Sequence, residues 1–139
     1  MTDFINLVNN ALAEKNKTTA DLFNDSIVSK DTFYKYRHRY PSVCTLLKIS
    51  NYLKVTPDYL LELSDENDFK EDYTFDSEKF YLNLTKILKS KNISGRNFCK
   101  ALNYSKDNVS RWKKGTVPST LNLIQISSYF EISISDILL

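Results

Sequence analysis

Apolar residues recur every three or four positions in two segments, F-I-N-L-V-N-N-A-L-A-E-K-N from Phe4 and F-Y-L-N-L-T-K-I-L-K-S-K-N from Phe80. In both segments the apolar side chains fall at positions i, i+4, i+7 and i+8, which lie on one face of an α-helix. The pattern therefore predicts an amphipathic helix at the start of the chain and another over about residues 77–91.

The two segments are the beginnings of an internal repeat. The repeat has an offset of 76 residues, which becomes 77 after a point where the first copy is one residue shorter. A match of this length indicates two copies of about 60 residues, 1–63 and 80–139, joined by residues 64–79. The matching stretches are Ser29-Lys30-Asp31 with Ser105-Lys106-Asp107, Tyr36 with Trp112, Pro41-Ser42 with Pro118-Ser119, and Leu61 with Leu138.

Each copy predicts five short helices, so the expected fold class is all-α. Gly115 supplies a left-handed exit after the third helix of the second copy. In the first copy Ile27 takes the place of Asn103 in the turn before that helix, where a left-handed conformation would be strained, and the exit at Arg39-Tyr40 has no glycine. Side-chain oxygens that can cap helix N-termini are expected at Thr18, Ser29, Ser42, Thr56, Ser94, Ser105, Ser119 and Ser133.

The sequence lacks the patterns that support catalysis or a bound cofactor. It has two glycines and therefore no Gly-rich phosphate loop, and no nucleophile–base pair stands out, so we expect neither enzyme activity nor a cofactor. Cys44, Cys99 and His38 are too few and too widely spaced for a zinc site. We interpret both cysteines as reduced core residues of a cytosolic protein.

No stretch approaches the roughly 18 consecutive apolar residues of a membrane span. The N-terminal sequence M-T-D-F-I-N-L also lacks the basic and apolar regions of a signal peptide. We therefore expect a cytoplasmic protein that does not contact a membrane.

The net charge of +2 hides an uneven distribution. Residues 80–139 carry nine Lys/Arg and three Asp/Glu, whereas residues 64–79 carry two Lys/Arg and seven Asp/Glu. Residues 1–63 are nearly balanced, with eight basic and seven acidic residues. A basic second copy favours a nucleic-acid partner, and the acidic join is most simply a solvated linker.

The second copy contains S-K-D-N-V-S-R-W-K-K-G-T-V-P-S at Ser105–Ser119, followed by a Leu/Ile-rich segment. This pattern resembles the helix-turn-helix domain of the Cro and lambda-repressor family, also called the xenobiotic-response-element-like family. The resemblance covers the second copy from about Phe80 to Leu139 and, less closely, the first copy through V-T-P-D-Y-L-L at Val55–Leu61. It implies two tandem five-helix DNA-binding domains, of a kind usually found in bacterial and phage repressors.

The resemblance also implies which residues would contact DNA. The third helix of such a domain lies in the major groove, with its N-terminal residues at base edges. A purely structural interpretation stays open for some of these residues. Asp31 and Asp107 would stabilise a first helical turn, and Lys113 and Lys114 would be ordinary solvated charges. The positions that match base-contacting residues are Lys106, Asp107, Asn108 and Arg111 in the second copy and Lys30, Asp31, Thr32 and Lys35 in the first. The positions that match phosphate-contacting residues are Ser94, Arg96, Lys113, Lys114, Thr18, Arg37, His38 and Arg39.

The resulting hypothesis is a sequence-specific, double-stranded-DNA-binding transcriptional regulator that acts as a repressor. Its two unlike copies would form a built-in pseudo-dimer on an asymmetric site, and a homodimer formed through one copy stays open. The alternative is a protein-binding module on a helix-turn-helix scaffold, such as an antitoxin, a phage anti-immunity factor or the partner of a regulator. Two features favour this alternative: the acidic join, and the irregular first copy, which has a face rich in aromatic residues at Phe33, Tyr34, Tyr36 and Tyr40.

Overall fold

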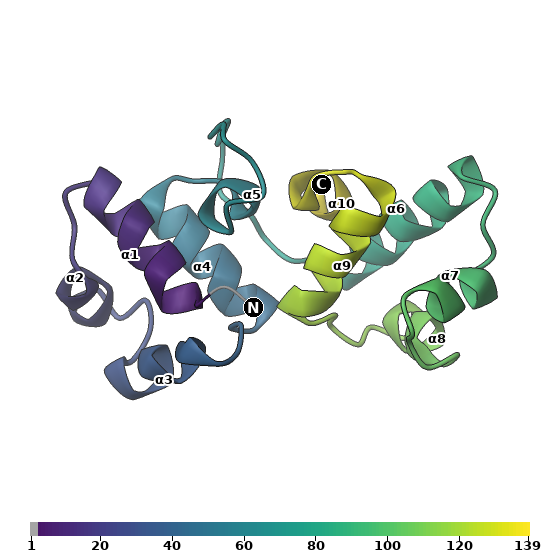
Figure 1. Ribbon diagram of the computed structural model, residues 1–139, viewed down its shortest axis with the longest axis horizontal. Coiled ribbons are helices and arrows are strands. Elements are labelled where there is room, and N and C mark those ends of the chain that lie inside the picture. Colours follow the sequence, from purple (N-terminus) through teal and green to yellow (C-terminus); the bar gives the residue numbers. More distant parts are fainter. Residues whose placement is uncertain (1–2) are drawn as a thin grey trace. The chain divides into compact units, whose positions relative to one another are not determined.

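The computed structural model describes residues 3–139, which form helices and connecting segments without a β-strand (Figure 1). The chain divides into two compact units, the first ending at Thr74 and the second beginning at Phe75. In the first unit the helices are α1 (Phe4–Glu14), α2 (Thr19–Asn24), α3 (Lys30–Tyr34), a 3₁₀ helix (Lys35–Arg37), α4 (Val43–Leu53) and α5 (Pro57–Leu60). In the second unit they are α6 (Ser77–Ser90), α7 (Gly95–Ala101), α8 (Asn108–Lys113), α9 (Thr120–Phe130) and α10 (Ile134–Leu138).

Most helices begin at the predicted caps. Structural N-caps are found at Thr18, Ser29, Ser42, Thr56, Ser94, Ser119 and Ser133. The prediction for Ser105 is wrong, because Asp107 occupies the N-cap position of α8, without a capping hydrogen bond from its side chain. The Ser105 carbonyl accepts the N–H of Asn108 at 3.0 Å and its hydroxyl oxygen accepts the N–H of Asp107 at 3.3 Å. This closed turn delays the start of the helix by two residues.

The repeat is visible in the backbone as matching left-handed residues. Asn16 and Asn92 have φ values of 56° and 55° after the first helix of each unit, and Lys54 and Glu131 have 56° and 55° after the fourth. Such residues end helices by exposing the last carbonyls to the N–H groups that follow. The two units therefore share a backbone plan as well as a sequence pattern.

The expected strain at Ile27 is absent, because the left-handed residue is Ser26, with a φ of 58°. Helix α2 has six residues and α7 has seven, so the turn in the first unit occurs one residue earlier than the sequence offset places it. The exit from α3 also differs. It runs through the 3₁₀ helix, whereas the second unit uses Gly115 at a φ of 104°.

Each unit is built on an aromatic core. In the first, Phe4 and Phe33 are fully buried and both rings contact Tyr36. In the second, Phe80 and Phe98 are fully buried. Edge-to-face ring pairs of this kind add to the stabilisation from burying the rings themselves.

The interpretation of both cysteines as core residues is half wrong. Both thiols are free, and Cys99 is buried, but Cys44 is exposed. Cys44 follows the first residue of α4, and its neighbour Val43 takes the inward position with 1% exposure.

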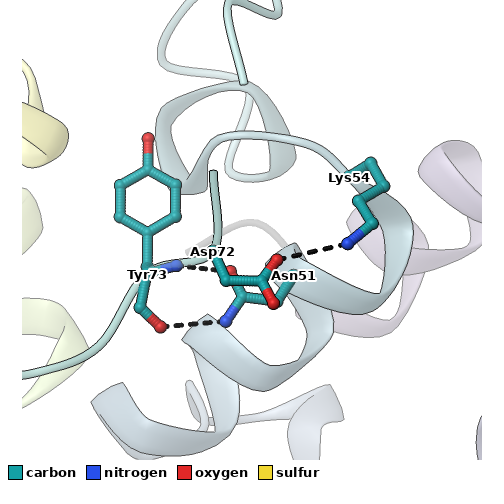
Figure 2. A network of polar contacts seen from close by, with 4 residues as sticks. All are labelled: Asn51, Lys54, Asp72 and Tyr73. Atoms are coloured by element: carbon teal, nitrogen blue, oxygen red, sulfur yellow. Dashed lines mark hydrogen bonds and ion pairs between the residues drawn. The ribbon is translucent and has the colours of Figure 1, made fainter. Parts of the chain in front are cut away.

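Part of the acidic join is fastened to the first unit (Figure 2). The Asn51 side chain donates to the Tyr73 carbonyl at 2.9 Å and accepts the Tyr73 N–H at 2.7 Å, and Tyr73 is only 8% exposed. The Asn67 side chain bonds the backbone in the same way, donating to the Lys54 carbonyl at 3.1 Å and accepting the N–H of Thr56 at 3.1 Å. Residues 67–73, which we call the strap, therefore follow the C-terminal end of α4.

The strap is held by the asparagines more than by its charges. Lys54 Nζ lies 3.2 Å from the Asp72 carboxylate, but both side chains are 64% exposed, so water screens the pair and it adds little stability. Lys54 also lies over the Phe69 ring at 5.6 Å. The two hydrogen bonds of Asn51 are part-buried, so breaking them lowers the stability of the unit more than breaking the exposed ion pair does.

We expect Asn51→Ala to release the strap and to lower the free energy of unfolding by about 1–2 kcal/mol, because it removes both part-buried hydrogen bonds between the Asn51 side chain and the Tyr73 backbone. The measurements are a urea titration and limited proteolysis at Lys70. Ser128→Ala is the matched control, since Ser128 is the repeat equivalent of Asn51 in α9. Unchanged cleavage at Lys70 in Asn51→Ala would contradict the assignment.

Candidate nucleic-acid interface

The orientation of α8 is fixed by Trp112, which is 3% exposed. Its ring meets Phe80 edge-on at 5.5 Å and an interplanar angle of 78°, and meets Tyr104 at 5.9 Å and 83°. With this side chain anchored in the core, the opposite side of the helix faces solvent. The exposed candidates on and beside α8 are Lys106, Asp107, Arg111, Lys113 and Lys114.

Asn108 occupies a different position from the other base-contact candidates. Successive residues of an α-helix are about 100° apart, which places Asn108 only about 40° from Trp112 around the helix axis. Asn108 is accordingly part-buried. Ser110, about 160° from Trp112, is exposed at the centre of the outer face and was not among the sequence candidates.

The third helix of the first unit is anchored by Phe33 and Tyr36, which are 0% and 4% exposed. The exposed candidates here are Lys30, Asp31, Lys35, Arg37, His38 and Arg39. Thr32 is part-buried, and its hydroxyl is 2.8 Å from the Ser29 hydroxyl, so it is already engaged in the cap of α3. Tyr34, the repeat equivalent of Ser110, is 40% exposed and was also not among the base-contact candidates.

The comparison with known families agrees with this geometry. A sequence model described as the Cro/C1-type HTH DNA-binding domain matches the chain twice, over residues 8–66 and 83–138. The protein belongs to the Cro/C1-type helix-turn-helix family. No curated protein and no solved structure has a significant match to the chain.

The family assignment establishes two tandem helix-turn-helix units, α2–α3 in the first and α7–α8 in the second. None of the helices in the described residues 3–139 has the length and apolar character needed to cross a membrane. Over the same residues no three His, Cys, Asp or Glu side chains are grouped so that they could hold a metal ion.

Burial of the aromatic residues weakens the argument for the alternative function, in which they would form a protein-binding face. Of the four aromatic residues that suggested a protein-binding face, Phe33 and Tyr36 lie in the core of their helix-turn-helix unit. Tyr40 is part-buried with its ring 6.3 Å from Phe4. Only Tyr34 presents a large exposed fraction, and it does so on α3.

The two helix-turn-helix units differ at the N-terminus of the second helix. In the second unit the Ser94 hydroxyl oxygen accepts the N–H of Asn97 at 3.1 Å, and Arg96 beside it is exposed. In the first unit Asp21 replaces that asparagine, and its carboxylate accepts the N–H of Thr18 at 2.8 Å. The Asp21 carboxylate already places a negative charge at the N-terminus of α2, where it would repel a phosphate. The N-terminus of α7 carries no such carboxylate, so the second unit is better suited to hold a phosphate there.

A tyrosine packs beside the third-helix region of each unit, Tyr36 in the first and Tyr104 in the second. Burial raises the pKa of Tyr36 and of Tyr104 above the ordinary value, and the Tyr104 hydroxyl donates to Gln125 Oε1 at 2.6 Å. Both phenols therefore stay neutral at physiological pH. The charge of the candidate interface comes only from the exposed basic and acidic side chains.

Proposed function

We propose that this protein is a sequence-specific double-stranded-DNA-binding transcriptional repressor that places α8 in the major groove. The observation that carries the proposal is the anchoring of Trp112, which leaves Arg111 and Lys113 exposed on the third helix of a family-matched unit, with Lys106 exposed in the turn before it. In such a unit the third helix reads base edges, and Arg and Lys there donate to guanine. The repressor role rests on the resemblance to bacterial and phage repressors.

The proposal gives each unit its own half-site. The second unit presents Arg111 and Ser110 on α8 and Lys106 just before it, whereas the first unit presents Tyr34 and Lys30 on α3 and Lys35 just after it. Because the two sets of side chains differ in shape and hydrogen-bonding capacity, the operator has two unlike halves. Lys113 and Lys114, at the C-terminal end of α8, are assigned to the phosphate backbone, where they add affinity without sequence information.

The test begins with selection of duplexes from a random library, followed by titration of the best duplex over a salt series. Specific binding with a clearly negative log–log salt slope is expected, because each neutralised phosphate releases condensed counterions. Equally weak binding to every duplex would rule the proposal out. A pull-down partner that survives nuclease treatment, together with such weak DNA binding, would favour the protein-binding alternative.

We expect Lys113→Ala to weaken binding to all duplexes alike and to reduce the magnitude of the salt slope by about one, since one phosphate contact is lost. The measurement is the dissociation constant on specific and unrelated duplexes at four or more salt concentrations. Lys86→Ala is the control, because Lys86 is an exposed lysine of the same unit that lies on α6 and not on the third helix. A change confined to the specific duplex would contradict the phosphate assignment.

A further inference from the structure

Tyr34 is an aromatic residue on the outside of α3, and its ring contacts three neighbouring side chains. Its ring lies 5.6 Å from the Phe33 ring at an interplanar angle of 74°, and 6.3 Å from the Phe23 ring at 56°. The Arg37 guanidinium lies over it at 5.8 Å from the ring centre. Although three side chains hold the ring, Tyr34 is still 40% exposed.

The position of Tyr34 on the helix places it among the base-contact candidates. At about 100° per residue, Tyr34 lies about 40° around the axis from Lys30, and Asp31 lies about 100° from Lys30 in the same direction. Both of these neighbours are exposed. Tyr34 therefore falls inside the arc of α3 that the proposed function assigns to the major groove.

We propose that Tyr34 is a specificity-determining residue that lays its ring against the methyl group of a thymine in the half-site of the first unit. This inference rests on the proposed function. The edges of the base pairs in the major groove carry hydrogen-bond donors and acceptors, and the thymine methyl is the apolar group among them. A ring that already contacts Phe23, Phe33 and Arg37 has less conformational freedom to lose on binding than an unsupported side chain has.

The same position distinguishes the two units. Its repeat equivalent on α8 is Ser110, an exposed small polar side chain that presents no apolar surface of comparable size. The thymine preference therefore belongs to one half of the operator only. Tyr34 supplies a chemical reason for the asymmetry of the site beyond the differences among the charged residues.

The test changes the DNA one methyl group at a time. In the duplex selected by the wild-type protein, each thymine is replaced in turn by deoxyuridine, which removes the methyl and keeps the base pair. For one thymine the affinity of the wild-type protein is expected to fall about fourfold, the effect of exposing one buried methyl group. For Tyr34→Ala that same replacement is expected to have no effect, whereas Tyr34→Phe should respond like the wild type.

The matched control is Tyr129→Ala. Tyr129 is 41% exposed and contacts the rings of Phe98 and Phe130 at 6.4 and 4.9 Å, but it lies on α9 and not on a third helix. It therefore reproduces the loss of an exposed ring from an aromatic core, and it should keep the wild-type response to deoxyuridine. Circular dichroism of each variant verifies that it is folded.

The outcomes separate this inference from the proposed function. If the wild type binds its selected duplex specifically but every deoxyuridine replacement acts equally on wild type and Tyr34→Ala, the thymine contact is wrong and the DNA-binding function stands. If Tyr34→Phe loses the response together with Tyr34→Ala, the hydroxyl and not the ring makes the contact, and the inference fails. If the wild type shows no sequence preference at all, both fail.

Discussion

Replacing Trp112 with alanine is expected to unfold the second unit under conditions in which the wild-type protein is folded. Trp112 is 3% exposed and its ring contacts Phe80, Phe98 and Tyr104. Truncating a buried large aromatic side chain costs about 3–5 kcal/mol through lost burial and the cavity left behind. A unit of this size has only a small stability margin, so a loss of that order removes most of it.

Because Trp112 is the only tryptophan, the measurement uses circular dichroism and two-dimensional NMR in place of fluorescence. We expect the amide signals of residues 75–139 to collapse while those of the first unit stay dispersed. Leu121→Ala is the control, since Leu121 lies in the same unit but is 47% exposed. An unchanged unfolding midpoint for Trp112→Ala would show that the side chain does not anchor α8.

Replacing Arg111 with alanine is expected to reduce sequence preference sharply while leaving the fold intact. The side chain is exposed on α8 and contributes nothing to the core around Trp112. An arginine that donates two hydrogen bonds to guanine discriminates against other bases by roughly tenfold to a hundredfold. The preference at one or two base pairs of the second half-site should therefore disappear.

The measurement is a repeated selection with Arg111→Ala, compared with the base frequencies obtained with the wild type. Arg96→Ala is the control, because Arg96 is exposed in the same unit beside the N-terminus of α7 and is assigned to phosphate. It should weaken binding and leave the base frequencies unchanged. If Arg111→Ala instead weakens all duplexes equally, Arg111 belongs to the phosphate contacts and another residue carries the specificity.

The helix starts could be predicted because capping is a local property. Ser119 and Asn122, three residues apart, form a reciprocal pair of side-chain-to-backbone hydrogen bonds, and such spacing is visible in the sequence. Ser105 shows the limit of the method. It has the right residue type and the right repeat position, but a tight turn follows it and the helix begins only after Asp107.

The register of the first unit was less predictable. Counting from the second copy places Ile27 in the left-handed turn, and the sequence alone does not show that α2 is shorter by a residue than α7. Ser26 adopts that conformation instead. The shift also frees Ile27 to donate its N–H to the Leu22 carbonyl at 2.9 Å, which closes the end of the helix.

Some residues of the candidate interface could be predicted from the sequence and others could not. The resemblance predicts which charged residues lie on or beside the third helices, and the structure shows those residues exposed. Tyr34 and Ser110 were missed, since their exposure depends on how Trp112 and Tyr36 rotate each helix in its unit. The sequence instead groups Tyr34 with Phe33, Tyr36 and Tyr40 as a possible protein-binding face, because residue type alone does not distinguish an exposed ring from a core ring.

The strap depended on pairing between residues 22 positions apart, which composition does not reveal. It has a consequence for the statistics of tethered binding. From charge alone the join is 16 residues of free chain, but the strap is fixed through Tyr73 and α6 begins at Ser77. Only residues 74–76 lie between the strap and α6, and Asp76 already caps that helix. A short tether that can span both sites gives a high effective concentration of one binding module near the other once the first is bound. We therefore expect binding of both units to tolerate little variation in the spacing between the half-sites. Asn51→Ala, which releases the strap, should widen the range of spacings that is tolerated.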